Sequence, residues 1–269
     1  MKNAQTWAPS KFVLERGRLR ASHNPKEISA GSRLGAELVA SCYDTHVKNH
    51  CRGRLLDLGC GKVPFYALYR PYVSETVCVD WRNSSHGNDY LDAECDLTKD
   101  LPFADESFDT ILLSDVLEHI PTPGRLWLEM GRLLKPGGKV LLNVPFFYYL
   151  HEEPYDFFRY TKYALRRFAE TTGFKVVLIK EVGGAPEVLV DIVSKSILRL
   201  GSVGEWTALA LQGACLSLVT SPLGARISEK TAKQFPLGYF MIAQRLGGSK
   251  ADQQINNKER SQRTLRQNF

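Results

Sequence analysis

The sequence predicts an α/β fold with a mostly parallel sheet and helices on both of its faces. Short apolar runs alternate with segments of helical periodicity along most of the 269 residues, and this alternation is typical of parallel sheets. Two glycine pairs, within residues 57–61 and 135–138, mark places where a strand or helix ends. The composition, 43% hydrophobic and 24% charged, is that of a globular domain with a sizeable core.

The expected elements follow from these patterns. Strands are expected at residues 55–58, 75–80, 90–94, 108–113, 139–144, 174–180 and 239–244. Helices are expected at residues 25–47, 123–134 and 161–173. Thr161 can act as the N-cap of the last helix, and Gly173 suits the position after its end. A turn is expected at residues 135–138, where Lys-Pro-Gly-Gly stops a helix.

Most of the formal net charge of +6 lies at the two ends of the chain. Residues 1–33 carry seven Lys or Arg against two Glu, and residues 245–269 carry six against two acids, which leaves the segment between them at −3. Basic ends can contact nucleic acid or anionic lipid. We favour a mobile basic arm at residues 1–24 and a disordered basic tail at residues 247–269, flanking one domain at residues 25–246.

Cysteine usage and hydropathy indicate the cellular compartment of the protein. The six cysteines form no C-x-x-C pair, and they and the six histidines show no clustering at metal-ligand spacing. We therefore expect reduced thiols and no metal site. The first residues lack the apolar region of a signal peptide, and residues 206–219, an apolar run, are too few and too polar for a membrane span. These features predict a cytoplasmic protein.

Residues 182–235 form a long insertion between the last two expected strands. Asp191, Lys195 and Arg199 lie at i, i+4 spacing with apolar residues on another face, which predicts an amphipathic helix. A second helix is expected at residues 206–219. The insertion can serve as a substrate lid, a homodimer contact or a surface for lipid-linked acceptors, and ordinary packing is favoured over peripheral membrane contact.

The run Asp-Leu-Gly-Cys-Gly at residues 57–61 sits where the first strand gives way to a helix. Glycines there let the backbone approach a ligand closely, and the carboxyl ends of parallel strands form the usual ligand crevice. The third glycine of a dinucleotide motif is missing, and Asp57 opposes a phosphate ligand because two negative charges would meet. An acid at this position instead suits a cationic amine or sulfonium.

Two more acids follow strand ends. Asp80 ends the second expected strand and can accept both hydroxyls of a ribose, and Trp81 can lie against a purine. Asp96 lies just beyond the third strand and can accept a hydrogen bond from an adenine amino group. Each acid alone is usually a surface or capping residue, so the placement of all three at successive strand ends is what favours one ligand site.

With the stretches at residues 95–109, 116–120 and 134–138, these motifs resemble class I S-adenosylmethionine-dependent methyltransferases. The similarity is greatest to the small-molecule branch (methyltransferase type 11-like) that includes ubiquinone and menaquinone biosynthesis enzymes. It covers residues 50–181 and the final strand, and implies a Rossmann-like seven-stranded sheet whose last strand is antiparallel. The implied cofactor is S-adenosyl-L-methionine. Its expected contacts are Asp57, Gly59, Cys60, Gly61, Asp80, Trp81, Asp96, Leu97, Ser114 and Asp115.

Residues 151–161, after the fifth strand, are the best acceptor-side candidate. They resemble a His-x-x-Pro-x-Asp-Phe-x-Arg-Tyr-Thr stretch in bacterial members of this family, many of them associated with surface-glycan genes. We expect His151 to be a general base or to orient one. Arg159 is expected either to hold an anionic part of the acceptor or to pair with Asp156, and a purely structural ion pair is equally consistent. His119 is an alternative base, although a helix-start role near the cofactor is favoured for it.

The predicted function is thus transfer of a methyl group from S-adenosylmethionine to an oxygen or carbon of a small molecule, sugar or lipid-linked glycan. A cofactor-binding partner or regulatory protein without turnover is the alternative. A third hypothesis, a nicotinamide-dependent dehydrogenase, is disfavoured because the glycine motif is incomplete. A nucleic-acid acceptor is disfavoured, because neither Asn-Pro-Pro-Tyr nor Asp-Pro-Pro-Tyr follows the fourth strand.

Overall fold

The centre of the molecule is a seven-stranded sheet with the strand order β5-β4-β3-β6-β7-β9-β8. The computed structural model describes residues 1–82, 87 and 89–247. The strands are β3 Gly53–Leu58, β4 Val73–Asp80, β5 Ala93–Glu94, β6 Phe108–Ser114, β7 Leu134–Pro145, β8 Phe174–Val182 and β9 Gly238–Arg245. The strands from β5 to β7 are parallel, and β9 lies antiparallel between β7 and β8. The predicted fold class is confirmed, including its antiparallel last strand.

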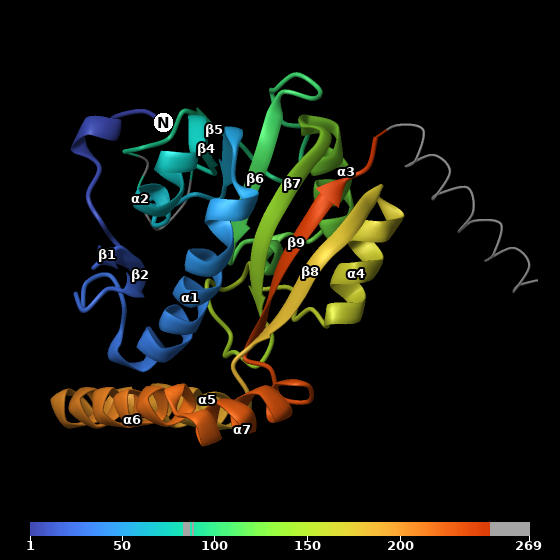
Figure 1. The fold of residues 1–269 in the computed structure, drawn as a ribbon. Helices are drawn as coiled ribbons and strands as arrows, with labels where there is room; N and C mark the ends of the chain where they lie inside the picture. The colour runs from blue at the N-terminus through green and yellow to red at the C-terminus, as the bar shows by residue number, and fades with distance from the viewer. Residues whose placement is uncertain (83–86, 88, 248–269) are drawn as a thin grey trace, which may run out of the picture.

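Helices cover both faces of this sheet (Figure 1). One side carries α1 (Arg33–His50) and α2 (Tyr66–Tyr69), and the other carries α3 (Pro123–Leu133) and α4 (Lys162–Thr171). In β3, Leu55 packs into the core beside α1, whereas Leu56 and Leu58 pack into the core beside α3, because successive side chains point to opposite faces. All three leucines are fully buried, as expected for a central parallel strand.

The predicted ends of α4 are confirmed, and two other local expectations are wrong. Thr161 Oγ1 accepts a hydrogen bond from the Ala164 N–H at 3.2 Å, and Gly173 adopts φ 86°. The helix expected from residue 25 begins only at Arg33, after a loop and a short 3-10 turn. Residues 135–138 are not a separate turn: they lie within β7 and form an irregularity between Leu134, which pairs with Phe108, and Lys139, which pairs with Thr110.

The expectation that residues 1–24 form a mobile arm is wrong. They contain the antiparallel hairpin β1 (Phe12–Glu15) and β2 (Arg18–Ala21). Phe12 is 1% exposed and its ring centroid lies 4.7 Å from that of Phe65. Each of the two short strands buries few side chains, so its apolar pattern is too brief to stand out among the basic residues. The predicted tail at 247–269 lies outside the described residues from 248 onward.

The insertion consists of α5 (Ala185–Ile197), α6 (Ser202–Thr220) and α7 (Pro222–Ala232). These helices form a layer across the end of the sheet at which β7 ends and β9 begins (Figure 1), which confirms the expected helical insertion. No single helix of the described chain is long and apolar enough to cross a membrane; α6 and α7 meet that length and composition test only as a pair bent by 96°.

Candidate active site

A cleft of about 1080 Å³ lies at the carboxyl ends of the parallel strands. All ten expected cofactor positions line it, and so do His119 and His151. Two expected site residues, Asp156 and Arg159, do not line it. The topology therefore gathers residues that are up to 94 positions apart in the sequence, because every parallel strand delivers its last residues to the same edge.

The glycine turn after β3 forms one wall of the cleft. Gly59 has φ 68° and Gly61 has φ 50°, the left-handed region that glycine tolerates best. A Cβ on Gly59 would lie 2.4 Å from the Val116 side chain, so no larger residue fits there without a shift. The Cys60 side chain is 2% exposed and packs into the core, so its thiol contributes packing to the turn.

Asp57 and Asp80 hold the turn from two neighbouring strands. Asp80 accepts hydrogen bonds from the Gly61 N–H at 2.9 Å and from the Trp81 N–H at 2.8 Å. Asp57 is almost fully buried and accepts a hydrogen bond from the Tyr69 hydroxyl at 3.2 Å. Burial raises the pKa of Asp57 to about 7; the Tyr69 hydrogen bond opposes this rise, and the nearby Asp80 charge adds to it. The cleft thus has a carboxyl group that titrates near neutral pH.

Asp96, Leu97 and Trp81 line the neighbouring part of the cleft. The Asp96 carboxylate accepts hydrogen bonds from the Thr98 N–H and hydroxyl at 2.9 and 2.6 Å, which lower its pKa. Leu97 is buried, whereas Trp81 is 36% exposed with its ring edge-on to Tyr155 at 5.1 Å. An apolar floor beside an oriented acceptor and an exposed indole suits a purine base.

The end of β6 forms a polar network that includes residues missed by sequence reasoning. The Ser114 hydroxyl donates to Asn143 Oδ1 at 2.6 Å, and Asn143 in turn donates to Asp115. Tyr43 also donates to Asn143 Oδ1, at 2.9 Å. Lys11, from the supposed arm, pairs with Asp115 at 2.9 Å. Burial acts to lower the pKa of Lys11, but Asp115 outweighs it and the pKa is raised.

The loop at residues 146–160 is anchored by an ion pair. Arg159 binds both carboxylate oxygens of Asp156, at 2.6 and 2.7 Å, and its remaining N–H groups donate to the backbone carbonyls of Tyr148, Tyr149 and Phe158. Arginine has five N–H donors, so Arg159 has none left for an acceptor. Of the two roles expected for Arg159, pairing with Asp156 is the one that this structure contains, and all five N–H groups are engaged within the loop.

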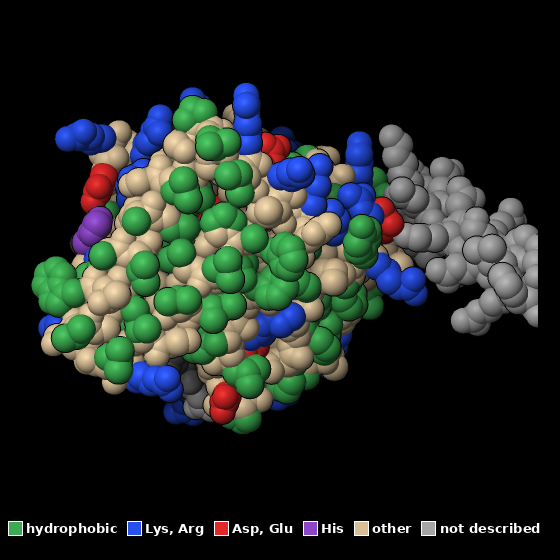
Figure 2. Space-filling view, turned by 90° about the horizontal axis from the view of Figure 1, so that it is seen from below, with side chains coloured by type: hydrophobic (Ala, Val, Ile, Leu, Met, Phe, Trp, Pro, Cys, Tyr) green, Lys and Arg blue, Asp and Glu red, His purple; other side chains and the backbone are tan. Residues whose placement is uncertain are grey.

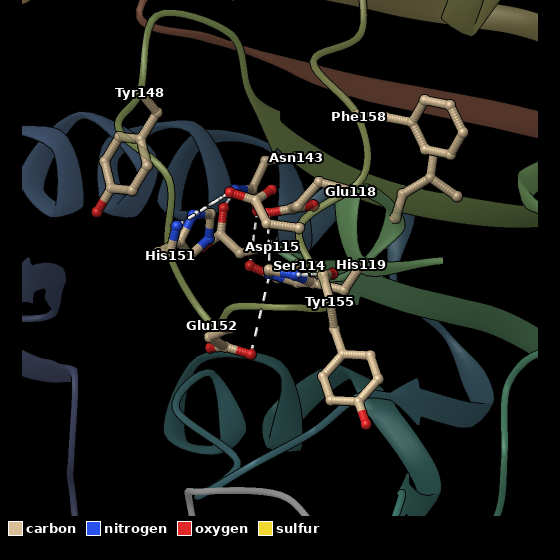
Figure 3. A network of polar contacts seen from close by, with 12 residues as sticks. Ser114, Asp115, Glu118, His119, Asn143, Tyr148, His151, Glu152, Tyr155 and Phe158 are labelled. Carbon is tan, nitrogen blue, oxygen red and sulfur yellow. Dashed lines mark hydrogen bonds and ion pairs between the residues drawn. The ribbon is translucent and has the colours of Figure 1, made fainter. Parts of the chain in front are cut away.

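His151, His119 and Glu118 come together on the acceptor side of the cleft (Figure 3). The two imidazole centroids are 4.8 Å apart, and His119 Nε2 lies 3.8 Å from Glu118 Oε1. Burial and the neighbouring His119 lower the pKa of His151, so its imidazole is neutral at pH 7. The expected base is therefore in the cleft and in the protonation state that accepts a proton.

Glu118 was not anticipated, and it is the most unusual residue of the cleft. It is fully buried, and neither carboxylate oxygen has a hydrogen-bond partner among the described residues. Burial, and then the charge of Asp115, raise its pKa well above the ordinary value. Its position one residue before His119 is the only signal in the sequence, because acids before histidines are common on surfaces.

The cleft fits S-adenosylmethionine by the chemistry of its donors. Carboxylates at residues 57 and 80 suit a cationic methionine part and a ribose, while the glycine turn leaves space for close approach. The described residues of the turn offer no cluster of free backbone N–H groups for a pyrophosphate, since the Gly59 and Cys60 N–H groups donate to the Val79 carbonyl.

Comparison with known proteins supports this assignment. Residues 56–142 match the family model described as a methyltransferase domain. An uncharacterized methyltransferase of Mycobacterium sp. (strain JLS) is 33% identical over 147 residues, 51% of this chain and 57% of that protein. One of Mycobacterium tuberculosis is 56% identical over 43 residues, 16% of this chain and 17% of that protein. The chain thus spans less than two thirds of the length of either relative.

Solved structures show the same architecture at low identity. The cyclase SpnF aligns with a TM-score of 0.51 at 16% identity, over 84% of this chain and 86% of its own. A Haloferax volcanii protein in complex with the Trm112 methyltransferase activator aligns with a TM-score of 0.51 at 17% identity, over 81% and 94%. The fold is the Rossmann-like fold of S-adenosylmethionine-dependent methyltransferases, and the family match indicates a methyltransferase domain over residues 56–142. A cyclase on the same fold shows that the reaction must be argued from the site.

Proposed function

We propose that this protein transfers the methyl group of S-adenosylmethionine to an oxygen or carbon of a small molecule, sugar or lipid-linked glycan. The observation that carries the proposal is the single cleft that joins the acids at the ends of β3 and β4 to the neutral His151. One end suits the cofactor, and the other offers a proton acceptor to the substrate. A binding protein without turnover would not need the second end.

For methyl transfer, the protein must align the acceptor with the methyl group and remove the acceptor's proton. The sulfonium cofactor supplies an electrophilic methyl carbon. The acceptor oxygen or carbon forms a bond to this methyl as the sulfur–methyl bond breaks and its electron pair stays on sulfur. The acceptor's proton passes to His151, whose backbone N–H is held by Asp156 at 3.0 Å. Desolvation in the cleft and in-line alignment supply the remaining rate enhancement.

The substitution His151→Ala tests the proposal. With a panel of hydroxylated sugars and lipid-linked glycans, wild-type protein is expected to release S-adenosylhomocysteine with one acceptor class. The variant should lose roughly a hundredfold in kcat, the usual contribution of a positioned base, with unchanged cofactor affinity. His23→Ala is the control, because His23 is exposed and outside the cleft. Normal turnover by a folded His151→Ala variant would contradict the base assignment.

A further inference from the structure

The buried cluster on the acceptor side of the cleft points to a ligand beyond the cofactor. The donor atoms of Glu118, His119 and His151 all lie within 4.8 Å of one another. Glu118 is 0% exposed, and neither of its oxygens has a hydrogen-bond partner among the described residues, although a buried carboxylate is costly unless it is paired or bound to a metal. A cation bound beside it would favour the ionised carboxylate and balance its charge.

The histidines are oriented for coordination. His119 Nδ1 lies 2.9 Å from the Tyr155 carbonyl oxygen, which accepts hydrogen bonds only, so Nδ1 is the donor and Nε2 is the nitrogen that faces the cluster. His151 Nδ1 lies 3.3 Å from the Tyr149 carbonyl and 3.2 Å from the Asp156 carboxylate. Such a partner on the far nitrogen is the usual arrangement for metal-bound histidine, because it fixes the tautomer and the ring orientation.

We propose that Glu118, His119 and His151 bind one divalent transition-metal ion such as Zn²⁺, with an open coordination position toward the cleft. Two histidines and one carboxylate are a known ligand set for catalytic zinc, in which the fourth position holds water or substrate. Tetrahedral zinc places its ligand atoms about 3.4 Å apart. Side-chain movements on the order of 1 Å would therefore bring these three ligand atoms, which now lie within 4.8 Å of one another, to zinc-binding distances. Glu152 Oε2, 4.0 Å from His119 Nε2, lies beside the open position.

Sequence spacing gave no hint of this site, and no metal was expected. His119 and His151 are separated by 31 residues and come from different loops, one after β6 and one after β7. The inference rests on the proposed function and deepens it: an ion here would bind the acceptor oxygen and make its hydroxyl more acidic, and Glu152, whose Oε2 lies 4.0 Å from His119 Nε2, would take the proton that His151 takes when no ion is bound. In that arrangement His151 is a metal ligand, and the acceptor class narrows to molecules with a hydroxyl group.

Zinc binding is measured without turnover. Chelator-treated protein is titrated with Zn²⁺ while the thermal unfolding midpoint and the heat of binding are followed. One ion per chain is expected to bind and to raise the midpoint, since a ligand of the folded state stabilises it. The six cysteines are all buried and do not compete.

Two variants and a control locate the ion. Glu118→Gln and His119→Gln should each weaken Zn²⁺ affinity by roughly tenfold or more, and His23→Gln should leave it unchanged. Without Zn²⁺, Glu118→Gln should unfold no lower than wild type, because it removes an unpaired buried charge. A titration without binding, or binding that Glu118→Gln leaves intact, would overturn the metal site. Methyl transfer by chelated protein would overturn only the metal's role and leave the proposed function standing.

A second inference rests on the outer face of the α5–α7 layer, independent of the cleft. Large apolar side chains are more than half exposed there: Leu189, Leu200, Val203, Trp206, Leu218 and Leu223. Figure 2 views this face from below and shows apolar side chains spread across it, with Lys and Arg gathered toward its edges. Contiguous apolar faces of this kind mark interaction sites.

We infer that this face docks on an anionic membrane surface. Glu205 is the only charged residue in the nineteen residues of α6. Arg199, Arg226, Lys230 and Lys233 are exposed on the neighbouring segments, against one exposed acid of α7, Glu229. Apolar side chains with an exposed tryptophan and basic neighbours are the signature of an interfacial helix. A membrane-bound enzyme would meet lipid-linked acceptors where they reside.

Flotation with vesicles tests this surface. Wild-type protein should float with phosphatidylcholine vesicles that contain phosphatidylglycerol, and less with phosphatidylcholine alone. The double variant Trp206→Glu/Leu223→Glu should remain at the bottom, while Leu128→Glu, an equally exposed change on α3, should float. Absence of flotation would overturn the inference. So would a solution dimer that the double variant dissociates, because a second copy of the chain would then cover the face.

Discussion

At the residue scale, buried carboxylates set the properties of the cleft. Asp57 and Glu118 both have raised pKa values because they are removed from water. Within the described part of the chain, the Asp57 carboxyl has a hydrogen-bond partner and the Glu118 carboxyl has none. On the neighbouring strand, two backbone N–H groups hold the Asp80 carboxylate. Asp57, near the end of β3, is thus an acid that titrates near neutral pH inside the cleft.

Asp57 predicts how cofactor binding depends on pH. Below its pKa of about 7 the carboxyl is neutral, and above it the carboxylate attracts a cationic ligand. Affinity for S-adenosylmethionine should therefore rise roughly tenfold between about pH 6 and about pH 8, the change in the ionised fraction. Calorimetry in buffers of different ionisation enthalpy should also detect proton release on binding. Asp57→Asn should abolish the dependence; a pH-independent wild type would contradict the assignment.

At the element scale, the loop at residues 146–160 depends on one guanidinium. Arg159→Lys should destabilise the fold by about 2 kcal/mol, because several charge-assisted hydrogen bonds are lost and lysine cannot replace the bidentate pair. Urea unfolding measures this free energy. Arg166→Lys is the matched control, since its partner Glu170 is on the exposed surface of α4 at 3.7 Å and such pairs contribute little. Equal effects of the two changes would argue against an anchored loop.

The hairpin β1–β2 gives a second prediction at this scale. Phe12→Ala should lower the free energy of unfolding by about 3–5 kcal/mol, because a buried ring leaves a cavity. Leu14→Ala, on the same strand but 43% exposed, should have a much smaller effect. Chemical denaturation of both variants measures the difference. If Phe12→Ala has no effect, residues 1–24 are the mobile arm that charge patterning suggested.

Sequence patterns predicted the elements with strong periodicity and missed contacts between distant segments. The strands, the cap at Thr161 and the strand-end acids follow from local signals such as apolar runs. Leu97, Ser114 and Asp115 were expected only from the resemblance to methyltransferases. Lys11 and Asn143 could not be predicted, because each acquires its role through a partner more than 25 residues away. The metal-like cluster was missed for the same reason.

At the scale of the whole molecule, the sheet and the layer of helices α5–α7 have different roles. The carboxyl edge of the sheet holds the cofactor end of the cleft, and α5–α7 lie across that edge with an apolar outer face. The residues at the cofactor end and the family match both indicate S-adenosylmethionine. The choice of methyl acceptor depends instead on the loops and the insertion. Cofactor identity is accordingly the central claim.

Titration calorimetry with S-adenosylmethionine and with NAD tests that claim most directly. We expect S-adenosylmethionine and S-adenosylhomocysteine to bind one per chain and NAD to give no heat, because the glycine turn lacks a pyrophosphate site. Asp80→Ala should weaken S-adenosylmethionine by roughly tenfold to a hundredfold through loss of charge-assisted hydrogen bonds. Binding of NAD in place of S-adenosylmethionine would contradict the assignment of this cleft.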